Sequence, residues 1–434
     1  MKTLEIANYI PRIADEEISE LMKVFGAVVI EGPKWCGKTT TAKSHALSET
    51  SMADPHNDFQ ARRIAELDPA LALEGPRPRL IDEWQDVPKL WDAVRYECDK
   101  APDRGQFILT GSSSPKKRKT SGKEQPKHSG AGRMARIPMG TMTQQEMGRS
   151  SGAVSVRGLF KGEVGKGVSG LSLKDVASLV VKGGWPAAID LPPDAAARIA
   201  RGYLQAVIEE DIHEVDGVER DKDKVRKLIA SLARNESTLA SNKTLMRDAR
   251  DPGATEETLT APTLNEYLDA LRRLYFVQDI LPWAPSMRSS IRIRSAVKRH
   301  LADPSLAAAS LGASVEALIQ DPETLGFLFE SLVAHDLIAY AGAMGAQVRH
   351  YHDDKDLEAD LVLEAADGSW VPVEVKLGAS QVDAAAKNLL AVKGKLERAG
   401  YRPPSALLVV VGVGGIAAMR DDGVQVATLD TLGI

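Results

Sequence analysis

The length, composition and charge of this chain exclude several classes of protein. Its 434 residues exceed the roughly 100 to 200 residues of one ordinary domain, so we expect two to four domains. Hydrophobic residues make up 43% and charged residues 26%, which excludes a disordered chain. A net charge of -5 argues against a protein that coats nucleic acid over its whole surface, although a local basic patch is compatible with it.

Neither the cysteines nor the apolar segments indicate export or a membrane. Cys36 and Cys98 are too few for a disulfide framework and lack the spacing of metal ligands, which fits a reducing cytosol. The N-terminus lacks an apolar secretory core. The longest apolar stretch, residues 406–419, is shorter than the roughly 20 residues of a membrane-spanning helix. We therefore expect a cytoplasmic protein with no membrane partner.

The clearest motif is a complete G-x-x-x-x-G-K-T. A strand-like apolar run, residues 26–30, precedes it, and residues 40–47 can form a helix after it. The glycines let backbone N–H groups point at phosphate oxygens, and the helix N-terminus adds about half a positive charge. The motif therefore predicts that Lys38 reaches the β and γ phosphates of ATP and that Thr39 binds Mg²⁺. The predicted nucleotide-binding residues are Gly32, Pro33, Lys34, Trp35, Cys36, Gly37, Lys38, Thr39 and Thr40.

Two acids end the next strand-like segment, residues 78–83. Asp82 is expected to hold the Mg²⁺ through its water shell, and Glu83 to act as the general base that polarises the attacking water. An isolated Asp-Glu pair is usually a solvated turn, but its place about 45 residues after the first motif favours function. A further strand-like run, residues 106–109, leads to Thr110 and Ser112. Their hydroxyls could hold the lytic water or sense the γ-phosphate, or could simply cap the strand.

A basic segment follows these motifs. Residues 115–136 contain eight lysines and arginines against one acid, Glu124, and are rich in glycine and serine. The segment is either a solvated linker or a mobile basic lid over phosphate or an external polyanion. Within it, Arg133 is a candidate for an arginine that acts on the nucleotide of a neighbouring subunit, because a guanidinium suits spread phosphoryl charge. That role would require a homo-oligomer.

Together these motifs resemble those of a known family, the prokaryotic AAA-type P-loop ATPases that carry a C-terminal domain of unknown function, family 4143. The resemblance rests on residues 32–39, 80–85, 109–113 and 131–133, and it implies an ATPase that uses ATP and Mg²⁺. Later landmarks of the same family extend the resemblance over nearly the whole chain; they are residues 183–186, 281–283 and 374–376. One departure is that prolines and arginines crowd residues 76–79, which predicts a shorter strand before the acid pair.

The middle of the chain reads as a linker followed by helices. Residues 151–198 are rich in glycine and small residues, and residues 195–216, 225–232 and 263–275 have helical periodicity. Residues 276–280 look like the first strand of a wing, so the unit resembles a winged helix in which Asn265, Arg272 and Arg273 could approach DNA. The favoured alternative is a helical packing module between domains. A basic run over residues 288–299 either binds phosphate or lines a surface.

Near the C-terminus, one acidic residue is followed by a second and then by an E-x-K motif. This order resembles that of the restriction-endonuclease-like superfamily. In that superfamily carboxylates hold Mg²⁺ and the lysine stabilises the scissile phosphate. A three-residue loop over 366–368 would pair residue 360 with 374 and place all the polar groups of this hairpin on one face, whereas a two-residue loop would mix the faces. A solvated acidic hairpin is the alternative. The predicted second site is Glu330, Asp360, Glu374 and Lys376.

These observations predict an α/β protein with a parallel P-loop sheet, a helical, winged-helix-like middle and an α/β restriction-endonuclease-like end. The expected segments are an ATPase domain over 1–150, a linker over 151–198, a connector over 199–310 and the final domain over 311–434. We expect ATP hydrolysis with Mg²⁺, coupled to a C-terminal module that binds nucleic acid or a partner protein. The alternatives are a metal-dependent DNA nuclease regulated by ATP, and a non-catalytic DNA- or protein-binding nucleotide switch.

Overall fold

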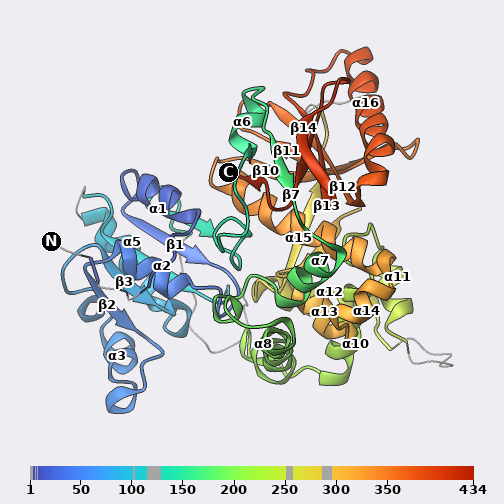
Figure 1. Ribbon diagram of the computed structural model, residues 1–434. Coiled ribbons are helices and arrows are strands. Elements are labelled where there is room, and N and C mark those ends of the chain that lie inside the picture. The colour runs from blue at the N-terminus through green and yellow to red at the C-terminus, as the bar shows by residue number, and fades with distance from the viewer. Residues whose placement is uncertain are drawn as a thin grey trace. The chain divides into compact units, whose positions relative to one another are not determined.

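The computed structural model divides the chain into two compact units (Figure 1). It describes residues 3–4, 6, 8–100, 103–114, 129–250, 258–285 and 296–434. Unit 1 comprises Met1–Thr141, Asp211–Glu219 and Ala270–Phe276. Unit 2 comprises Met142–Glu210, Arg220–Asp269 and Val277–Ile434.

Unit 1 is built on a five-stranded sheet in which every pair of neighbouring strands is parallel. This confirms the predicted parallel sheet. The two central strands, β1 and β4, are buried along their whole length, as the continuous apolar runs in the sequence require. The strands are β1 (Ala27–Glu31), β2 (Ser48–Ser51), β3 (Arg79–Asp82), β4 (Phe107–Gly111) and β5 (Met134–Pro138), in the order β2-β3-β4-β1-β5.

Helices cover both faces of this sheet, because side chains alternate between the faces along each strand. Val29 packs in one core cluster with Trp84 and Trp91, whereas its neighbour Ile30 packs in another with Ile18. β3 has only four residues and begins directly after Pro78, as the prolines and arginines before it predict. The helical elements of unit 1 before β5 are α1 (Ala14–Met22), α2 (Lys38–His45), α3 (His56–Leu67), α4 (Pro69–Ala72), η1 (Trp84–Asp86) and α5 (Lys89–Lys100).

Unit 2 contains a nine-stranded mixed sheet with the order β7-β14-β15-β13-β12-β11-β10-β8-β9. Its centre follows the chain order helix, three strands, helix, strand: α15 (Pro322–Gly342), β10 (Gln347–His352), β11 (Glu358–Glu364), β12 (Trp370–Gly378), α16 (Val382–Arg398) and β13 (Leu407–Val413). The remaining strands are β7 (Gly167–Ser169), β8 (Val277–Pro282), β9 (Lys298–Leu301), β14 (Gly415–Met419) and β15 (Val424–Thr428). The short turn η4 (Ala379–Gln381) precedes α16.

The hairpin of β11 and β12 has the register that the sequence predicts for a three-residue loop. Leu361 pairs with Val373, which places residue 360 opposite residue 374. Gly368 at the loop has φ +77, a left-handed value that glycine adopts without steric cost. Leu361 and Val373 are fully buried, so the alternation puts Asp360 and Glu374 together on the opposite face of the hairpin.

The helices of unit 2 include the predicted helical segments of the middle region. Residues 195–216 form α8 (Pro193–Ala206), the π-helical turn η3 (Val207–Asp211) and α9 (Ile212–Glu214), the last of which belongs to unit 1. The strand expected as a wing is β8, but it lies inside the large sheet, with β9 on one side and β10 on the other. The other helices are α10 (Lys222–Arg234), α11 (Asn242–Asp248), α12 (Ala261–Arg273), α13 (Pro304–Leu311) and α14 (Val315–Gln320).

The segment expected as a linker, residues 151–198, is instead folded into unit 2. β7 pairs with β14 near the other end of the chain. Val176 and Val180 bury one face of a helix that runs along this segment. The glycines and small residues therefore allow close packing here rather than an open connection. The elements of this segment are β6 (Val154–Ser155), which pairs with β16 (Leu432–Gly433), α6 (Val156–Phe160), α7 (Leu173–Lys182) and η2 (Pro186–Ala188).

A Gly-Gly-Trp-Pro turn follows α7 and packs against the start of α13. The backbone N of Gly184 donates to the fully buried carboxylate of Asp303 (2.9 Å), and its carbonyl accepts from the N of Met142 (2.7 Å). A Cβ on Gly184 would stand 2.1 Å from the oxygen of Met142. The indole of Trp185 donates to Ser305 Oγ (2.9 Å). This turn therefore requires glycine for close backbone packing.

α15 is long and apolar enough to cross a membrane by length and composition alone, with a mean hydropathy of 1.2. However, 67% of the 18-residue stretch of this helix that was tested is buried inside the protein, and the helix carries the buried acids Glu330 and Asp336. The core helices of soluble proteins pass the same test of length and composition.

Candidate functional site

The loop between β1 and α2 has the backbone conformation of a phosphate-binding loop. Gly37 has φ +102 and precedes Lys38, the first residue of α2. No side chain caps this helix start, so its first backbone N–H groups are oriented for an anion. A Cβ on Gly32 would lie 1.9 Å from the oxygen of Met139, so the start of the loop also requires glycine.

Buried side chains fix this loop in place. Lys38 is 4% exposed and its Nζ donates to the carbonyl of Pro33 (2.7 Å), so the ammonium group lies over the loop. The buried Arg12 donates to the carbonyl of Cys36 (2.8 Å) and, with its other nitrogen, to that of Thr141 (3.1 Å). The thiol of Cys36 donates to the carbonyl of Met139 (3.4 Å). The loop is therefore ordered by the protein itself.

The carboxylate of Asp82, at the C-terminal end of β3, accepts hydrogen bonds from three hydroxyl groups. Thr39 Oγ1 donates to Oδ1 of this carboxylate (2.7 Å), and so does Thr110 Oγ1 (2.6 Å). Ser51 Oγ donates to Oδ2 (2.9 Å). The C-terminal ends of parallel strands lie at one edge of a sheet, which brings β2, β3 and β4 together here. A threonine hydroxyl beside a carboxylate supplies the hard oxygen donors that Mg²⁺ prefers, so these residues fit that metal.

Glu83 follows Asp82 in a left-handed backbone conformation (φ 52). Its carboxylate accepts hydrogen bonds from Ser112 Oγ (2.8 Å) and from the side-chain amide of Gln85. The two predicted hydroxyl residues therefore contact different acids: Thr110, within β4, binds Asp82, and Ser112, just after β4, binds Glu83. The structure brings the predicted loop, acid pair and hydroxyls together at one end of the sheet. Sequence reasoning did not find Ser51, although it ends the strand next to β3.

A further ion pair joins the loop to the segment after α8. Lys34 Nζ lies 2.5 Å from Asp211 Oδ1, with side chains 40% and 7% exposed. Burial lowers the pKa of Lys34, but the hydrogen bond and charge of Asp211, with the charges of Glu214 and Glu83, outweigh it and raise that pKa. The predicted nucleotide-binding residue Lys34 is thus tied to a partner 177 positions away in sequence.

The other end of the site makes a similar contact. Ser114, just after β4, exchanges two hydrogen bonds with Arg273: its N donates to the Arg273 carbonyl (2.9 Å), and Arg273 Nε donates to its carbonyl (3.0 Å). The same guanidinium contacts Asp216 (3.3 Å) and is 11% exposed. Arg273 was a candidate for DNA contact. Its guanidinium is instead largely covered within unit 1, where these oxygens bind it.

The remaining basic candidates lie elsewhere. Arg133 is half exposed and its Nε lies 2.6 Å from Asp99, at the end of α5. Its action on a neighbouring subunit stays a prediction. Most of the basic segment, residues 115–128, lies outside the described residues, as do Arg288, Arg292 and Arg294.

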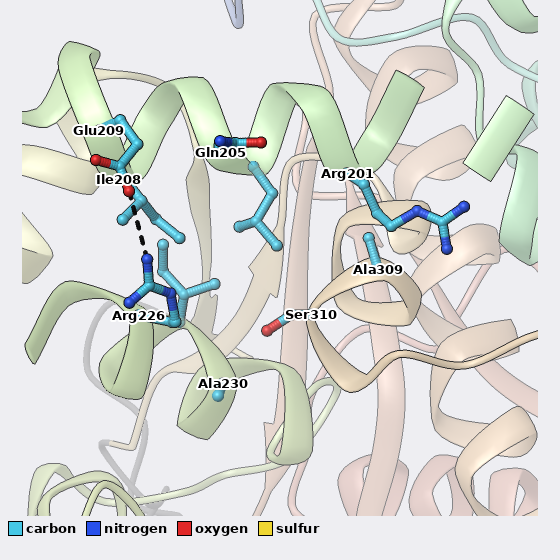
Figure 2. Close-up of a pocket in the computed structure, with 10 residues that line it drawn as sticks. Arg201, Gln205, Ile208, Glu209, Arg226, Ala230, Ala309 and Ser310 are labelled. Atoms are coloured by element: carbon cyan, nitrogen blue, oxygen red, sulfur yellow. Dashed lines mark hydrogen bonds and ion pairs between the residues drawn. The ribbon is translucent and has the colours of Figure 1, made fainter. Parts of the chain in front are cut away.

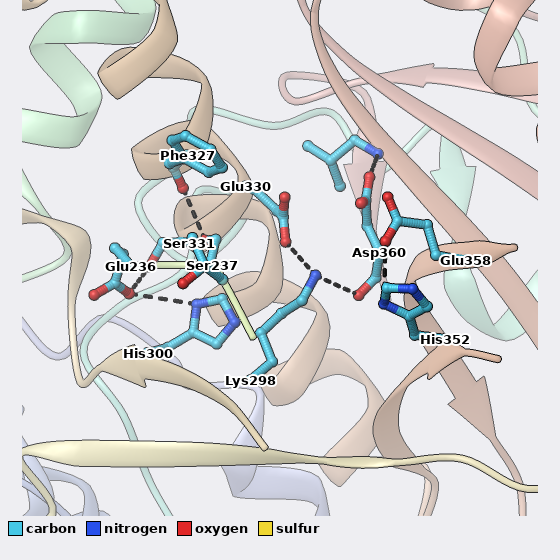
Figure 3. A network of polar contacts seen from close by, with 12 residues as sticks. Glu236, Ser237, Lys298, His300, Phe327, Glu330, Ser331, His352, Glu358 and Asp360 are labelled. Atoms are coloured by element: carbon cyan, nitrogen blue, oxygen red, sulfur yellow. Dashed lines mark hydrogen bonds and ion pairs between the residues drawn. The ribbon is translucent and has the colours of Figure 1, made fainter. Parts of the chain in front are cut away.

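The second predicted site is assembled in unit 2, but two lysines occupy it, one of which, Lys298, is labelled in Figure 3. Lys298 Nζ lies 2.7 Å from Glu330 Oε1. Lys376 Nζ lies 3.2 Å from Asp360 Oδ2 and 2.5 Å from Glu374 Oε2. Burial, aided by the charge of Asp360, raises the pKa of Glu374 to about 8. Burial also raises the pKa of Glu330 to about 7, against the opposing charge of Lys298.

Among the described residues, no group of three or more His, Cys, Asp or Glu side chains is arranged to hold a metal ion. Glu330, Asp360 and Glu374 each face an ammonium group instead. These residues therefore do not fit the Mg²⁺ site that the restriction-endonuclease-like pattern implies. Lys298 belonged to a basic run in the sequence, but nothing there placed it beside Glu330.

A separate cavity of about 290 Å³ lies among α8, α10 and α13 of unit 2 (Figure 2). Its acid, Glu209, is bound by Arg226 (3.4 Å) and by Lys222 (2.7 Å). The charges around Glu209 are therefore balanced within the protein.

Family models match three successive parts of the chain. An AAA domain matches residues 25–148, and the domain of unknown function DUF4143 matches residues 325–432. The chain therefore contains an AAA domain of the P-loop type and a DUF4143 domain. The AAA domain contains the loop, the acid pair and the hydroxyls described above. A second domain of unknown function, DUF8612, matches residues 173–317, between the AAA and DUF4143 domains.

Several known proteins are similar to this AAA-type chain. The uncharacterized proteins Rv2008c of Mycobacterium tuberculosis and Mb2031c of Mycobacterium bovis are each 26% identical over 351 residues, 78% of this chain and 67% of the relative. A Walker-type ATPase of Pyrococcus abyssi has a TM-score of 0.43 and 11% identity, over 72% of this chain and 98% of its own. The replication initiator DnaA bound to AMPPCP and single-stranded DNA has a TM-score of 0.28 and 14% identity, over 61% and 89%. Because both TM-scores are low, the family assignment rests on the family models.

Proposed function

We propose that the AAA domain binds ATP with Mg²⁺ and hydrolyses it, and that this cycle is coupled to unit 2. The contact between Thr39 and Asp82 (2.7 Å) carries the proposal, because it places a hydroxyl at the start of α2 beside a carboxylate at the end of β3. Mg²⁺ bound there would neutralise charge on the β and γ phosphates.

Other groups of the protein bind the phosphates, accept the proton and orient the carboxylates. The backbone N–H groups at the start of α2 bind phosphate oxygens, and Lys38 moves from the Pro33 carbonyl to the phosphates. Glu83 accepts a proton from the water that attacks the γ-phosphorus, while Ser112 holds the Glu83 carboxylate in place. Thr110 keeps Asp82 oriented toward Thr39.

Coupling is supported by two contacts at opposite ends of the site. Asp211 binds Lys34 of the loop, and Arg273 binds Ser114 beyond β4. Both partners lie where helices pass from unit 2 into unit 1: Asp211 ends η3, and Arg273 ends α12. A change in either part of the nucleotide site therefore acts directly on a segment continuous with unit 2.

The test of hydrolysis measures phosphate release by the parent, Lys38→Ala and Glu83→Gln. Lys38→Ala is expected to lose ATP binding. Glu83→Gln is expected to keep ATP bound and to lose about a hundredfold or more in turnover, because it lacks a proton acceptor. Asp86→Asn is the matched control, since this half-buried acid lies three residues along, and it should turn over at the parent rate. Equal turnover in the parent, Lys38→Ala and Glu83→Gln would refute the assignment.

A fluorescence titration separates binding from turnover. Trp35 in the phosphate loop is 59% exposed, whereas the other five tryptophans are between 1% and 3% exposed. Its emission should therefore change when Mg·ATP binds. Trp35→Phe should lose that response but keep turnover. A response unchanged in Trp35→Phe would mean that the signal arises elsewhere.

The other candidate functions concern the DUF4143 domain. A metal-dependent nuclease is supported by the chain order helix, three strands, helix, strand and by the hairpin register, but the two lysines at the acids oppose it. It predicts Mg²⁺- or Mn²⁺-dependent nicking that Asp360→Ala abolishes. A DNA- or protein-binding switch predicts affinity that ATP alters and, for DNA, that falls steeply with salt. We favour coupling to a binding module over cleavage.

A further inference from the structure

The acid cluster of unit 2 lies beside a cavity of about 270 Å³ that is lined by residues of α15 and of the strands β9, β10 and β11. Lys298, Glu330 and Asp360 all line this cavity, together with His350, His352 and Glu358. The cluster is thus accessible to small ions, although its central groups are largely buried: Lys298 is 7% exposed and Glu330 is 8% exposed.

Lys298 is the member of this cluster that the E-x-K pattern does not contain. It starts β9, where it pairs with Ile280 of β8, so the sheet fixes its backbone. Its Nζ lies 2.7 Å from Glu330 Oε1 and 3.0 Å from the backbone carbonyl oxygen of Asp360. Figure 3 shows the ammonium group between these two oxygens. A carboxylate and a backbone carbonyl are oxygen donors of the kind that Mg²⁺ and Ca²⁺ use.

A second lysine and two neutral donors bind the other carboxylates of this cluster. Lys376 lies between Asp360 and Glu374, and the second oxygen of Glu374 accepts from the side-chain amide of Asn388 (2.8 Å). The backbone N of Val375 donates to Asp360 Oδ2 (2.8 Å). Three carboxylates therefore face two ammonium groups and two neutral donors. A divalent ion would have to displace a buried lysine before it gained the same oxygens, and a buried ammonium group left without its carboxylate is strongly destabilising.

We propose that the ammonium group of Lys298 is a built-in cation that takes the place of a divalent metal between Glu330 and Asp360. The cluster then holds together without Mg²⁺ or Mn²⁺. This inference concerns unit 2 alone and does not depend on ATP hydrolysis by unit 1. It also predicts that removing the ammonium group creates a site for a divalent cation.

The experiment measures Mn²⁺ binding to the full chain by electron paramagnetic resonance, without nucleotide. Every protein carries Asp82→Asn, which removes the carboxylate proposed to hold Mg²⁺ in the AAA domain. Lys298→Met keeps most of the volume of the side chain and loses its charge. It should bind one Mn²⁺ at least about tenfold more tightly than the Asp82→Asn protein, because a positive charge next to the ligands is removed.

Two controls identify the site. Lys298→Arg keeps a cation and should gain no Mn²⁺. Adding Glu330→Gln to Lys298→Met should abolish the gain, because one of the proposed ligands loses its charge. If Lys298→Met folds and gains no Mn²⁺, or if the gain survives Glu330→Gln, the proposal is wrong.

A second measurement decides the matter if Lys298→Met does not fold. The Asp82→Asn protein is then compared with the same protein carrying Asp360→Asn. Equal binding of Mn²⁺ in both, up to about 1 mM, supports the built-in cation. A Mn²⁺ ion that binds below this concentration and is lost with Asp360→Asn overturns it, because the cluster would then accept a metal with Lys298 present.

Discussion

The ion pair between Lys34 and Asp211 allows the proposed coupling to be tested with a single change. Asp211→Asn keeps the size and shape of the side chain but removes its charge. A charge-assisted hydrogen bond of this kind contributes about 1.5–3 kcal/mol. Because the side chain of Lys34 is 40% exposed, solvent screening reduces this to about 1–2 kcal/mol. The turn η3 and α9 should therefore open about five- to thirtyfold more often in the variant.

Hydrogen exchange followed by mass spectrometry measures this opening in the full chain without nucleotide. The backbone amides of residues 207–214 should exchange about five- to thirtyfold faster in Asp211→Asn than in the parent. Lys34→Met should have the larger effect, because it leaves a carboxylate that is only 7% exposed without its cation.

Glu210→Gln is the matched control for this experiment. It removes a charge from the adjacent, exposed residue of the same turn and should leave the exchange unchanged. Exchange in Asp211→Asn at the parent rate, or equal acceleration in Glu210→Gln, would show that the ion pair with Lys34 does not stabilise this turn.

Two further predictions concern the stability of unit 2. Gly184→Ala should lower the free energy of unfolding by about 2–5 kcal/mol, because its Cβ would stand 2.1 Å from the Met142 oxygen and disturb the hydrogen bond to buried Asp303. Gly202→Ala, on the exposed side of α8 with nothing within 4 Å of the added Cβ, should change stability by no more than about 1 kcal/mol; equal losses in denaturant titrations would contradict this account. The raised pKa of Glu374, about 8 against an ordinary 4.5, predicts stability that is fully present below about pH 4.5 and is lost as the pH rises toward 8, by up to about 1.4 kcal/mol for each pH unit. Glu374→Gln should flatten this dependence in thermal unfolding between pH 5 and 8, and an unchanged slope would show that another group is responsible.

Local patterns in the sequence predicted the parts of the fold that depend on neighbouring residues. The apolar run before Gly32 became β1, and the acids after Pro78 ended β3, because strand burial and the phosphate loop are both encoded within about ten residues. The register of the β11–β12 hairpin was predicted correctly for the same reason, since loop length and alternation together determine which faces meet.

Contacts between distant residues could not be predicted in this way. The linker prediction failed because β7 has only three residues and its partner, β14, lies near the other end of the chain. The pair Lys34–Asp211 spans 177 positions, and Lys298 precedes Glu330 by 32. No periodicity or spacing links such residues. Only the folded sheet and its helices bring them together.

The position of β8 and β9 in the large sheet has a practical consequence for work on fragments. The DUF8612 model ends at residue 317 and the DUF4143 model begins at 325. These limits suggest that the two regions could be cloned as independent domains. However, β8 pairs with β10, so backbone hydrogen bonds cross that border. A fragment beginning at residue 325 would expose the bare edge of β10 to solvent, where another chain can pair with it and aggregate. The regions matched by the two family models therefore need to be expressed and purified together in one fragment.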